Sequence, residues 1–311
     1  MNILIVGTGV IGTIYGSVLS EEHNVLHFVR KEKMDTLNKK KISYDILDER
    51  MDKKHQNTSG TYIYNCVDEA DDSYDLIIVP VKSFHLTDVL HMLTKQAPNA
   101  HYLLFTLDWN SISEIDSILE KNQYIMGYAG GGGTFKSDLL WANVGKDIML
   151  GAVHQEQQML LNNVSELFNS CGIIAEIANN PLHWLWVHNV GSAPLGVALA
   201  KYNDIGKLLN DRNLVKTSFL AMREGYKICE KRGVNLKQYG EVKMIFIPLF
   251  ILYPLFKFNF TKNPIMQRYT AHALDSIDEM VQNFKEIFET GSSLGIDIPN
   301  MRMLMKIISE Y

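Results

Sequence analysis

The stretch NILIVGTGVIGTIYGSVL, residues 2–19, decides the fold that the sequence predicts. A short apolar run ending in glycine is typical of a buried strand, and residues 10–20 have the apolar spacing of a helix. Between them, Gly7, Gly9 and Gly12 form a G-x-G-x-x-G pattern, which in this context indicates a loop that holds the phosphates of a dinucleotide. Gly7 permits a tight turn, Gly9 lets backbone approach a pyrophosphate, and Gly12 allows close packing of helix on strand. The predicted cofactor-binding residues of the loop are Gly7, Thr8, Gly9, Val10, Ile11 and Gly12.

The rest of the chain divides into two parts by its apolar pattern. Further strands are expected at 25–29, 75–82, 101–107, 124–130 and 147–151, with helices near 84–96 and 111–121. This alternation predicts a doubly wound parallel sheet, whose ligands bind at the carboxyl ends of the strands. After about residue 178 helical periodicity dominates, over 181–200, 211–232, 264–290 and 300–310. We therefore expect an α/β domain over 1–178 and an all-helical domain over 179–311.

The end of the second predicted strand indicates which cofactor binds. Dinucleotide sites for NAD usually carry an acidic residue there, which binds the ribose 2′-hydroxyl. This chain has FVRKEK, with Arg30 and Lys31 at that position. A guanidinium can bind a 2′-phosphate through two hydrogen bonds, whereas a carboxylate would repel it. The sequence therefore predicts NADP(H).

Composition and charge exclude several other classes of protein. The 311 residues are 46% hydrophobic and carry a net charge of −5, so nothing favours a nucleic-acid partner. Three widely spaced cysteines, Cys66, Cys171 and Cys229, have neither metal-ligand nor redox spacing. No metal site is expected. A reducing compartment and the absence of a secretory signal at the start predict a cytoplasmic protein.

One apolar segment, IFIPLFILYPLFKF at 245–258, tests this expectation. It is shorter than the roughly 20 residues that a membrane span needs. Pro248 and Pro254 each interrupt helical hydrogen bonding, so we expect a proline-broken helical segment that is buried or faces an interface. A membrane-surface, subunit or substrate-pocket contact is the alternative, and a homodimer is one form that it could take.

The glycine loop, HFVRK, DLIIVPVK and the late segment GIDIPN together resemble the ketopantoate reductase (2-dehydropantoate 2-reductase) family across essentially the whole chain. The resemblance implies a Rossmann domain joined to a helical domain like that of 6-phosphogluconate dehydrogenase, which would serve for substrate binding and dimerisation. It also implies NADPH as hydride donor, a 2-keto acid as substrate and a role in pantothenate biosynthesis. The positions that match are Lys82 beside the nicotinamide, Gly132 and Glu279 at the cofactor, and Asn189 and Asn203 at the substrate.

The sequence departs from the family pattern in the segment HWLWVHNVGSAPL, residues 183–195. The family carries its proton-donating lysine four residues before the asparagine that aligns with Asn189, and this chain has Leu185 there. A second substrate asparagine is replaced by Ala193. A third falls on Leu107, unless a shifted alignment of that loop lets Asn110 serve.

A histidine one turn from Leu185 is the best local replacement for the lysine, because imidazole titrates near neutral pH. This is His188, which we take as a tentative proton donor, with Lys82 as the other catalytic candidate. Trp184 and Trp186 would line a pocket for a more apolar carbonyl substrate, or simply pack in the core.

The sequence is compatible with four functions. The protein is an ordinary ketopantoate reductase with another donor, or a similar NADPH-dependent enzyme for a more apolar carbonyl compound. Otherwise it is a catalytically degenerate NADP(H)-binding sensor or interaction protein, or a related dehydrogenase with opine-like or hydroxy-acid chemistry. We expect the oxidoreductase, because the resemblance is global.

Overall fold

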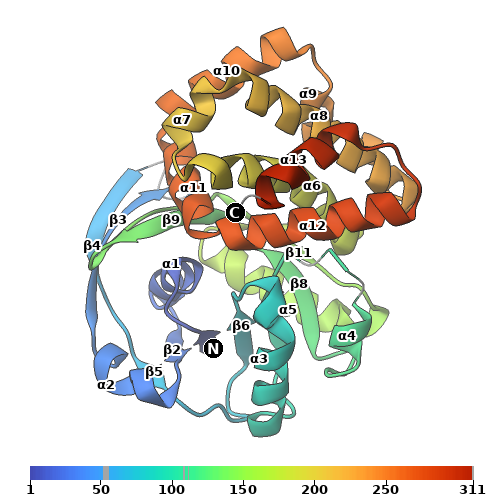
Figure 1. The fold of residues 1–311 in the computed structure, drawn as a ribbon. Coiled ribbons are helices and arrows are strands. Elements are labelled where there is room, and N and C mark those ends of the chain that lie inside the picture. The colour runs from blue at the N-terminus through green and yellow to red at the C-terminus, as the bar shows by residue number, and fades with distance from the viewer. Residues whose placement is uncertain (52–55, 108, 111, 310–311) are drawn as a thin grey trace. The chain divides into compact units, whose positions relative to one another are not determined.

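The computed structural model describes residues 1–51, 56–107, 109–110 and 112–309. The chain forms two compact units (Figure 1). Unit 1 comprises Met1–Thr106 and Asn110–Pro181, and unit 2 comprises Leu107–Trp109 and Leu182–Tyr311. Unit 1 is built on a largely parallel sheet and unit 2 is helical, which confirms the predicted fold class.

The main sheet of unit 1 has eight strands in the order β12-β11-β8-β7-β6-β1-β2-β5. Their bounds are β1 Asn2–Val6, β2 Asn24–Phe28, β5 Cys66–Val67, β6 Leu76–Val79, β7 Tyr102–Phe105, β8 Tyr124–Tyr128, β11 Asp147–Gly151 and β12 Ile174–Ile177. Every residue of β6 and β7 is buried, as expected for strands that are covered on both faces. The strands from β8 to β5 run parallel to one another.

Two features of this unit differ from the sequence prediction. β11 pairs antiparallel with β8, so β11 and β12 run against the rest of the sheet. A second sheet, in the order β4-β3-β10-β9, was not predicted at all. Its strands are β3 Lys41–Asp48, β4 Gln56–Ile63, β9 Gly131–Lys136 and β10 Leu139–Val144.

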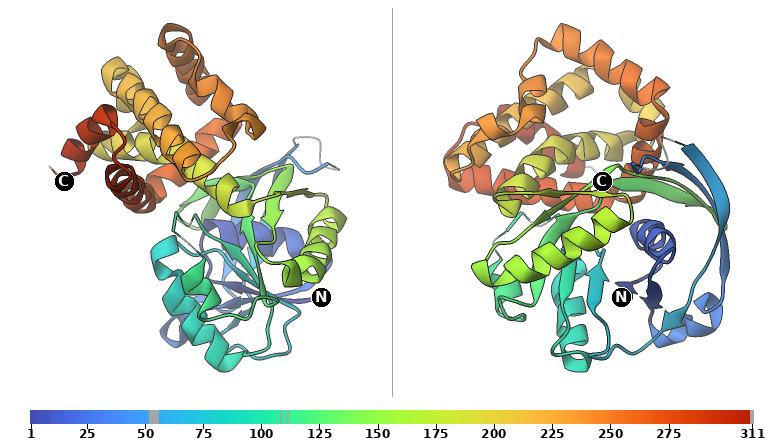
Figure 2. Two further views of the ribbon diagram at one scale, coloured as in Figure 1. Left: turned by 90° about the vertical axis from the view of Figure 1, so that its right-hand side faces the viewer. Right: turned by 180° about the vertical axis from the view of Figure 1, so that it is seen from behind.

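Helix α1, Val10–Leu19, lies between the two sheets (Figure 2). It contacts β1 and β2 of the main sheet on one side and β9 and β10 of the second sheet on the other. Enclosure on both sides explains why seven of its ten residues are buried, from Gly12 to Leu19. The helix that carries the predicted phosphate loop is therefore held in a rigid layer.

Other helices of unit 1 connect the strands. They are η1 Lys31–Lys33, α2 Met34–Leu37, α3 Ser83–Gln96, α4 Ser113–Asp116, η2 Gln155–Gln157 and α5 Gln158–Ser170. α5 packs on β8, β11 and β12. The helix expected over 111–121 is wrong in extent, because only α4 forms there; position 111 itself lies outside the described residues.

Unit 2 is an array of helices packed around α8, Arg212–Lys231, which contacts α7, α9, α10, α12 and α13. The other helices are α6 Pro181–Tyr202, α7 Ile205–Asn210, η3 Leu236–Gln238, α9 Gly240–Ile245, α10 Leu249–Lys262, α11 Pro264–Asp275, α12 Ile277–Ser293 and α13 Pro299–Ser309. The single helix expected over 264–290 is two helices, which are separated at Ser276.

Close approach of helices in unit 2 depends on glycines. A Cβ atom added at Gly225 of α8 would lie 2.7 Å from Cγ1 of Val190 in α6. One added at Gly196 of α6 would collide with Met280 of α12. Because real Cβ contacts are wider than this, α6 can pack against α8 and α12 at these points only with glycine.

The apolar segment 245–258 differs in part from its prediction. Pro248 separates α9 from α10, but Pro254 lies inside α10 without ending it. Leu252 is buried, whereas five large apolar side chains are 41–69% exposed: Phe246, Phe250, Ile251, Leu255 and Phe258. No helix formed by the described residues is both long enough and apolar enough to cross a membrane.

Candidate active site

The glycine loop has the backbone that a phosphate site requires. Gly7 has φ +86°, a left-handed conformation that favours glycine, and its N–H donates to the Phe28 carbonyl of β2 at 2.8 Å. A Cβ atom at Gly12 would lie 3.1 Å from the Gly7 carbonyl oxygen, so helix α1 approaches the loop closely. Gly9 has no atom within 4 Å of its would-be Cβ and is exposed. The loop is therefore packed closely against helix α1 at Gly12 and is open to solvent at Gly9.

Neither a capping side chain nor an acidic residue competes with an anion at the N-terminus of α1. Gly9 is the N-cap residue and offers no side-chain cap, and the first turn holds no acidic residue. The first N–H groups of a helix have no acceptor within the helix and carry partial positive charge. This arrangement suits a pyrophosphate. The other loop residues at this helix terminus, Thr8, Val10 and Ile11, are only partly buried.

A buried polar cluster beneath the loop holds it in place, and sequence reasoning missed it. His27 of β2 is fully buried; its Nδ1 donates to the Gly7 carbonyl at 2.8 Å and its Nε2 accepts from the Tyr62 hydroxyl at 2.9 Å. Burial lowers the pKa of His27 to about 4, against the smaller opposing effect of the hydrogen bond with Gly7. Beside it, Thr13 of α1 is 2.7 Å from the hydroxyl of Tyr64. The signal in the sequence was a histidine inside an otherwise apolar strand.

The predicted cationic residues lie at the same edge of the sheet as the loop. β1 pairs in parallel with β2 and with β6, so the loop after Val6, Arg30 after β2 and Lys82 after β6 follow the carboxyl ends of three neighbouring strands. Arg30 is exposed. β6 ends at Val79, so Lys82 is not a strand residue as expected but the N-cap residue of α3, and its Nζ lies 5.9 Å from the ring centre of Phe84.

Gly132, which the family resemblance places at the cofactor, lies in a strand. It belongs to β9, is buried and pairs with Asn143 of β10. A Cβ atom at the neighbouring Gly130 would collide with the Asp147 carbonyl oxygen. The glycine run at 130–133 therefore allows strands to pass close together, and its proposed cofactor contact stays a prediction.

Asn189 occupies the interior of unit 2. It is fully buried; its Nδ2 donates to the Leu107 carbonyl at 3.2 Å, and its Oδ1 accepts from Nδ2 of Asn283 in α12 at 2.9 Å. Leu107 thus contributes its backbone rather than a polar side chain. These bonds give the Asn189 amide a structural role in joining α6, α12 and the backbone of Leu107. Asn110 is exposed and belongs to unit 1.

Two of the three positions where the family's polar residues are missing, Leu185 and Ala193, are core positions. Leu185 is 0% exposed and Ala193 is 1% exposed. His188 stacks on Trp184, with ring centres 5.1 Å apart and planes 7° apart. Burial lowers the pKa of His188 to about 4, so its imidazole is neutral at pH 7. A proton donor of this kind is charged only in acidic solution.

Trp186 forms a cation–aromatic cluster that the sequence did not reveal. The guanidinium carbon of Arg232 lies 3.5 Å from the ring centre of Trp186 and 4.4 Å from that of Trp109. Arg232 also donates to the Trp109 carbonyl at 3.0 Å, and the Trp109 indole donates to Thr290 at 2.9 Å. These contacts fix Trp186 in the core of unit 2. Of the two roles considered for it from the sequence, pocket lining and core packing, they match core packing.

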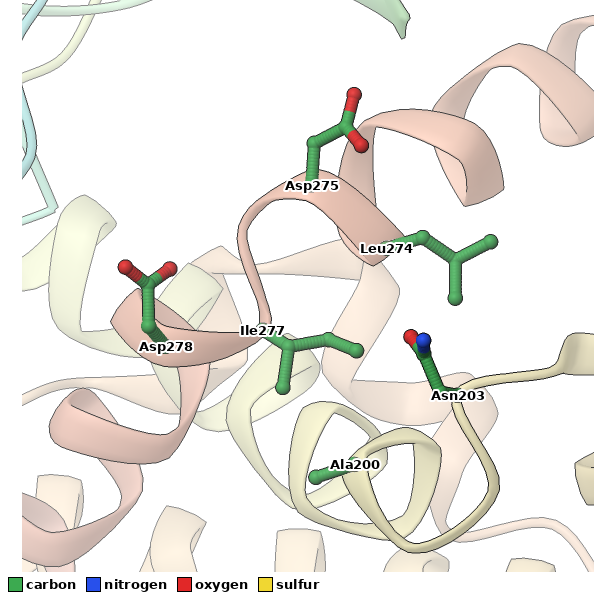
Figure 3. Close-up of a pocket in the computed structure, with 6 residues that line it drawn as sticks. All are labelled: Ala200, Asn203, Leu274, Asp275, Ile277 and Asp278. Carbon is green, nitrogen blue, oxygen red and sulfur yellow. The ribbon is translucent and has the colours of Figure 1, made fainter.

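Asn203 lines a cavity of about 350 Å³ (Figure 3). It follows α6, has φ +46° and is exposed. Two carboxylates from another part of unit 2 line the same cavity, Asp275 at the end of α11 and Asp278 at the start of α12. Glu279, the predicted cofactor residue, is the next residue of α12 and is partly buried. Sequence reasoning had found Asn203 but neither aspartate.

Comparisons with known proteins agree with this geometry. Residues 3–147 match the family model Ketopantoate reductase PanE/ApbA. A 2-dehydropantoate 2-reductase of Pyrococcus abyssi (strain GE5 / Orsay) is 23% identical over 247 residues, which is 76% of each chain. The chain is thus similar in sequence to ketopantoate reductases at low identity. The family resemblance predicted from the sequence is thereby confirmed.

Solved structures share the fold over the whole chain. D-mandelate dehydrogenase, solved with NADH and anilino(oxo)acetate, has a TM-score of 0.75 at 13% identity and covers 100% of this chain and 97% of its own. The dimeric ketopantoate reductase of Staphylococcus aureus has a TM-score of 0.69 at 12% identity, with coverage of 100% and 98%. At these identities the likeness concerns the fold alone.

Proposed function

We propose that this protein is an NADPH-dependent oxidoreductase that reduces a 2-keto acid, either ketopantoate or a related, more apolar carbonyl compound. The observation that carries the proposal is the open glycine loop at the N-terminus of α1, with Arg30 at the end of the adjacent parallel strand. A pyrophosphate at the loop and a 2′-phosphate at Arg30 match these groups in charge and in hydrogen-bonding capacity. When bound, NADPH supplies the hydride that the reaction needs.

The chain's own residues would then bind the substrate and supply a proton. Lys82 carries an ammonium group at the same sheet edge, a suitable partner for a substrate carboxylate or a developing alkoxide. His188 would be the donor only at low pH, because its lowered pKa leaves the imidazole neutral at pH 7. Asn203 is the exposed amide that remains for substrate binding, since the Asn189 amide is used within the core.

The test is turnover of NADPH with ketopantoate and with apolar and aromatic 2-keto acids. We expect NADPH oxidation with at least one of them, and a large loss of turnover in Lys82→Met. His188→Gln identifies the proton donor: if His188 donates, the fall in rate as the pH rises above about 4 disappears in this variant. An unchanged profile assigns the proton to another group.

A second candidate function is a non-catalytic NADP(H) sensor or interaction protein. It is favoured by the complete burial of Leu185 and Ala193, which leaves the family's polar positions apolar. Tight NADPH binding without turnover of any 2-keto acid would favour this function over the first.

For the rest of the molecule, we propose that the region 1–178 binds the cofactor and that 179–311 serves substrate binding and dimerisation. The dimeric S. aureus relative and the exposed apolar side chains of α10 support a homodimer. NADPH rather than NADH remains a proposal, because the D-mandelate dehydrogenase structure of the same fold holds NADH. Cytoplasmic location and a role in pantothenate biosynthesis are likewise proposed from the family.

A further inference from the structure

Three side chains with metal-binding atoms meet in unit 1, two adjacent in the sequence and the third about 150 residues later. Glu22 and His23 lie in the turn between α1 and β2, and Cys171 is the C-cap residue of α5. One carboxylate oxygen of Glu22, one ring nitrogen of His23 and the sulfur of Cys171 all lie within 4.8 Å of one another. In a tetrahedral zinc site, bonds of about 2.0–2.3 Å place the ligand atoms about 3.3–3.8 Å apart. Small movements of the side chains would therefore bring all three atoms onto one ion.

The imidazole of His23 gives independent support. Its Nε2 is enclosed by protein and has no hydrogen-bond partner among the residues that the structure describes. Nδ1 lies 3.4 Å from the amino nitrogen of Met1, a weak contact at most. Enclosed polar atoms in proteins nearly always have a partner, so an enclosed Nε2 without a protein partner leaves a position open for an ion or a water.

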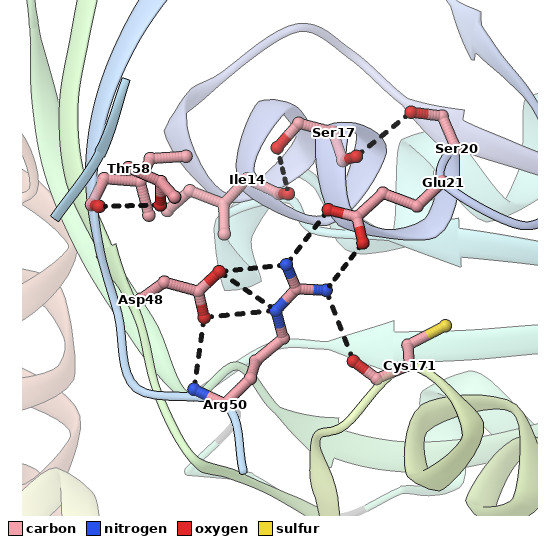
Figure 4. A network of polar contacts seen from close by, with 9 residues as sticks. Ile14, Ser17, Ser20, Glu21, Asp48, Arg50, Thr58 and Cys171 are labelled. Carbon is pink, nitrogen blue, oxygen red and sulfur yellow. Dashed lines mark hydrogen bonds and ion pairs between the residues drawn. The ribbon is translucent and has the colours of Figure 1, made fainter. Parts of the chain in front are cut away.

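The surroundings have room for an ion, and the nearby cation does not occupy the site. A cavity of about 190 Å³ adjoins the cluster, lined among others by Glu21, Glu22, Arg50 and Cys171. The Arg50 guanidinium is bound by Asp48 at 2.9 Å, by Glu21 at 3.0 Å and by the Cys171 carbonyl at 3.3 Å (Figure 4). Two carboxylates thus offset its charge and hold it on the backbone side of Cys171, away from the sulfur.

We propose that Glu22, His23 and Cys171 bind a thiophilic divalent cation, with Zn²⁺ as the expected ion and water as the fourth ligand. Zinc accepts this mixture of carboxylate, imidazole and thiolate in a tetrahedral site, whereas Mg²⁺ and Ca²⁺ prefer oxygen ligands only. On binding, the Cys171 thiol releases its proton to solvent and the imidazole carries its proton on Nδ1. The ion would tie the α1–β2 turn to the end of α5, independently of the proposed reductase activity.

Cobalt substitution tests the site directly, because Co²⁺ bound to a thiolate has a charge-transfer band in the near ultraviolet. The full-length protein is titrated with Co²⁺ and then with Zn²⁺, and bound metal is counted by equilibrium dialysis. We expect one ion per chain, a thiolate band, and displacement of Co²⁺ by Zn²⁺. In Cys171→Ser the band is lost, and in His23→Gln affinity falls at least about tenfold, since even residues that only support a metal ligand contribute that much.

Cys66→Ser is the matched control, because Cys66 is also a buried cysteine of unit 1 but lies outside the cluster. It should keep the band and the affinity. Circular dichroism and thermal unfolding of all variants without metal show whether each one folds. A parent protein without a thiolate band, or equal loss of the band in Cys66→Ser and Cys171→Ser when both are folded, overturns the proposal. NADPH binding and turnover are measured in parallel, and their failure would concern the reductase proposal alone.

Discussion

The buried histidine beneath the glycine loop makes stability depend on pH in a way that can be calculated. His27 is fully enclosed and donates from Nδ1 to the Gly7 carbonyl. Burial lowers its pKa from 6.5 to about 4. The folded protein therefore resists protonation of this ring, while the unfolded chain takes up a proton at an ordinary histidine pKa.

The sign and size follow from linkage. Because the folded pKa is lowered, the stabilisation is complete above pH 6.5 and is lost as the pH falls from 6.5 towards 4. The full difference between 6.5 and about 4 corresponds to about 3 kcal/mol, of which about 2 kcal/mol is lost between pH 7 and pH 5. His188 has a similarly lowered pKa, so only a comparison of variants isolates the part due to His27.

The assay is urea unfolding of the parent protein, His27→Gln and His101→Gln at pH 7 and pH 5. Glutamine cannot titrate, and its amide can still donate to the Gly7 carbonyl. We expect the parent protein to lose about 2 kcal/mol more than His27→Gln between the two pH values. His101 is exposed, so His101→Gln should behave as the parent does. Equal losses in the parent and His27→Gln would refute the reasoning.

Three further predictions concern unit 2, and urea unfolding checks each of them. Gly225→Val should destabilise by about 1–3 kcal/mol or more, because even its Cβ would press on Val190; an unchanged midpoint would contradict the close packing of α6 on α8. Asn189→Leu should destabilise by about 1–3 kcal/mol, since it leaves the buried Asn283 amide without an acceptor, and recovery in the double variant Asn189→Leu with Asn283→Leu would support that cause. Glu224→Ala should destabilise by about 1–2 kcal/mol through loss of the carboxylate that accepts backbone N–H groups at the start of α13, whereas Glu224→Asp should retain part of the effect.

Most of the elements that could be predicted from the sequence have patterns that are local in the chain. The glycine loop, the buried strands and the long helices of unit 2 each reveal themselves within about twenty residues through periodicity and turn chemistry. Strands that pair with a partner far along the chain show weaker patterns in the sequence. β3 and β4 are rich in polar residues and alternate irregularly in burial, and β3 pairs with β10 almost a hundred residues later.

The candidate site was predicted unevenly for the same reason. Arg30 and the glycine loop follow directly from strand ends. The partner of Asn189 is Asn283, 94 residues away, so the engagement of this amide within the core could not be read from the sequence. Glycine disfavours strands, yet the glycines at 130–133 allow neighbouring strands to come close.

The binding preference for NADPH over NADH is the measurement that tests the central claim most directly. Cofactor fluorescence gives both affinities for the parent protein, for Arg30→Ala and for the control Lys33→Ala, which changes an exposed charge of the same segment. We predict that NADPH binds more tightly than NADH in the parent and in Lys33→Ala. Loss of the 2′-phosphate contact in Arg30→Ala should weaken NADPH at least about tenfold, equivalent to about 1.4 kcal/mol, and leave NADH nearly unchanged. Equal affinities for the two cofactors in the parent protein would contradict the account.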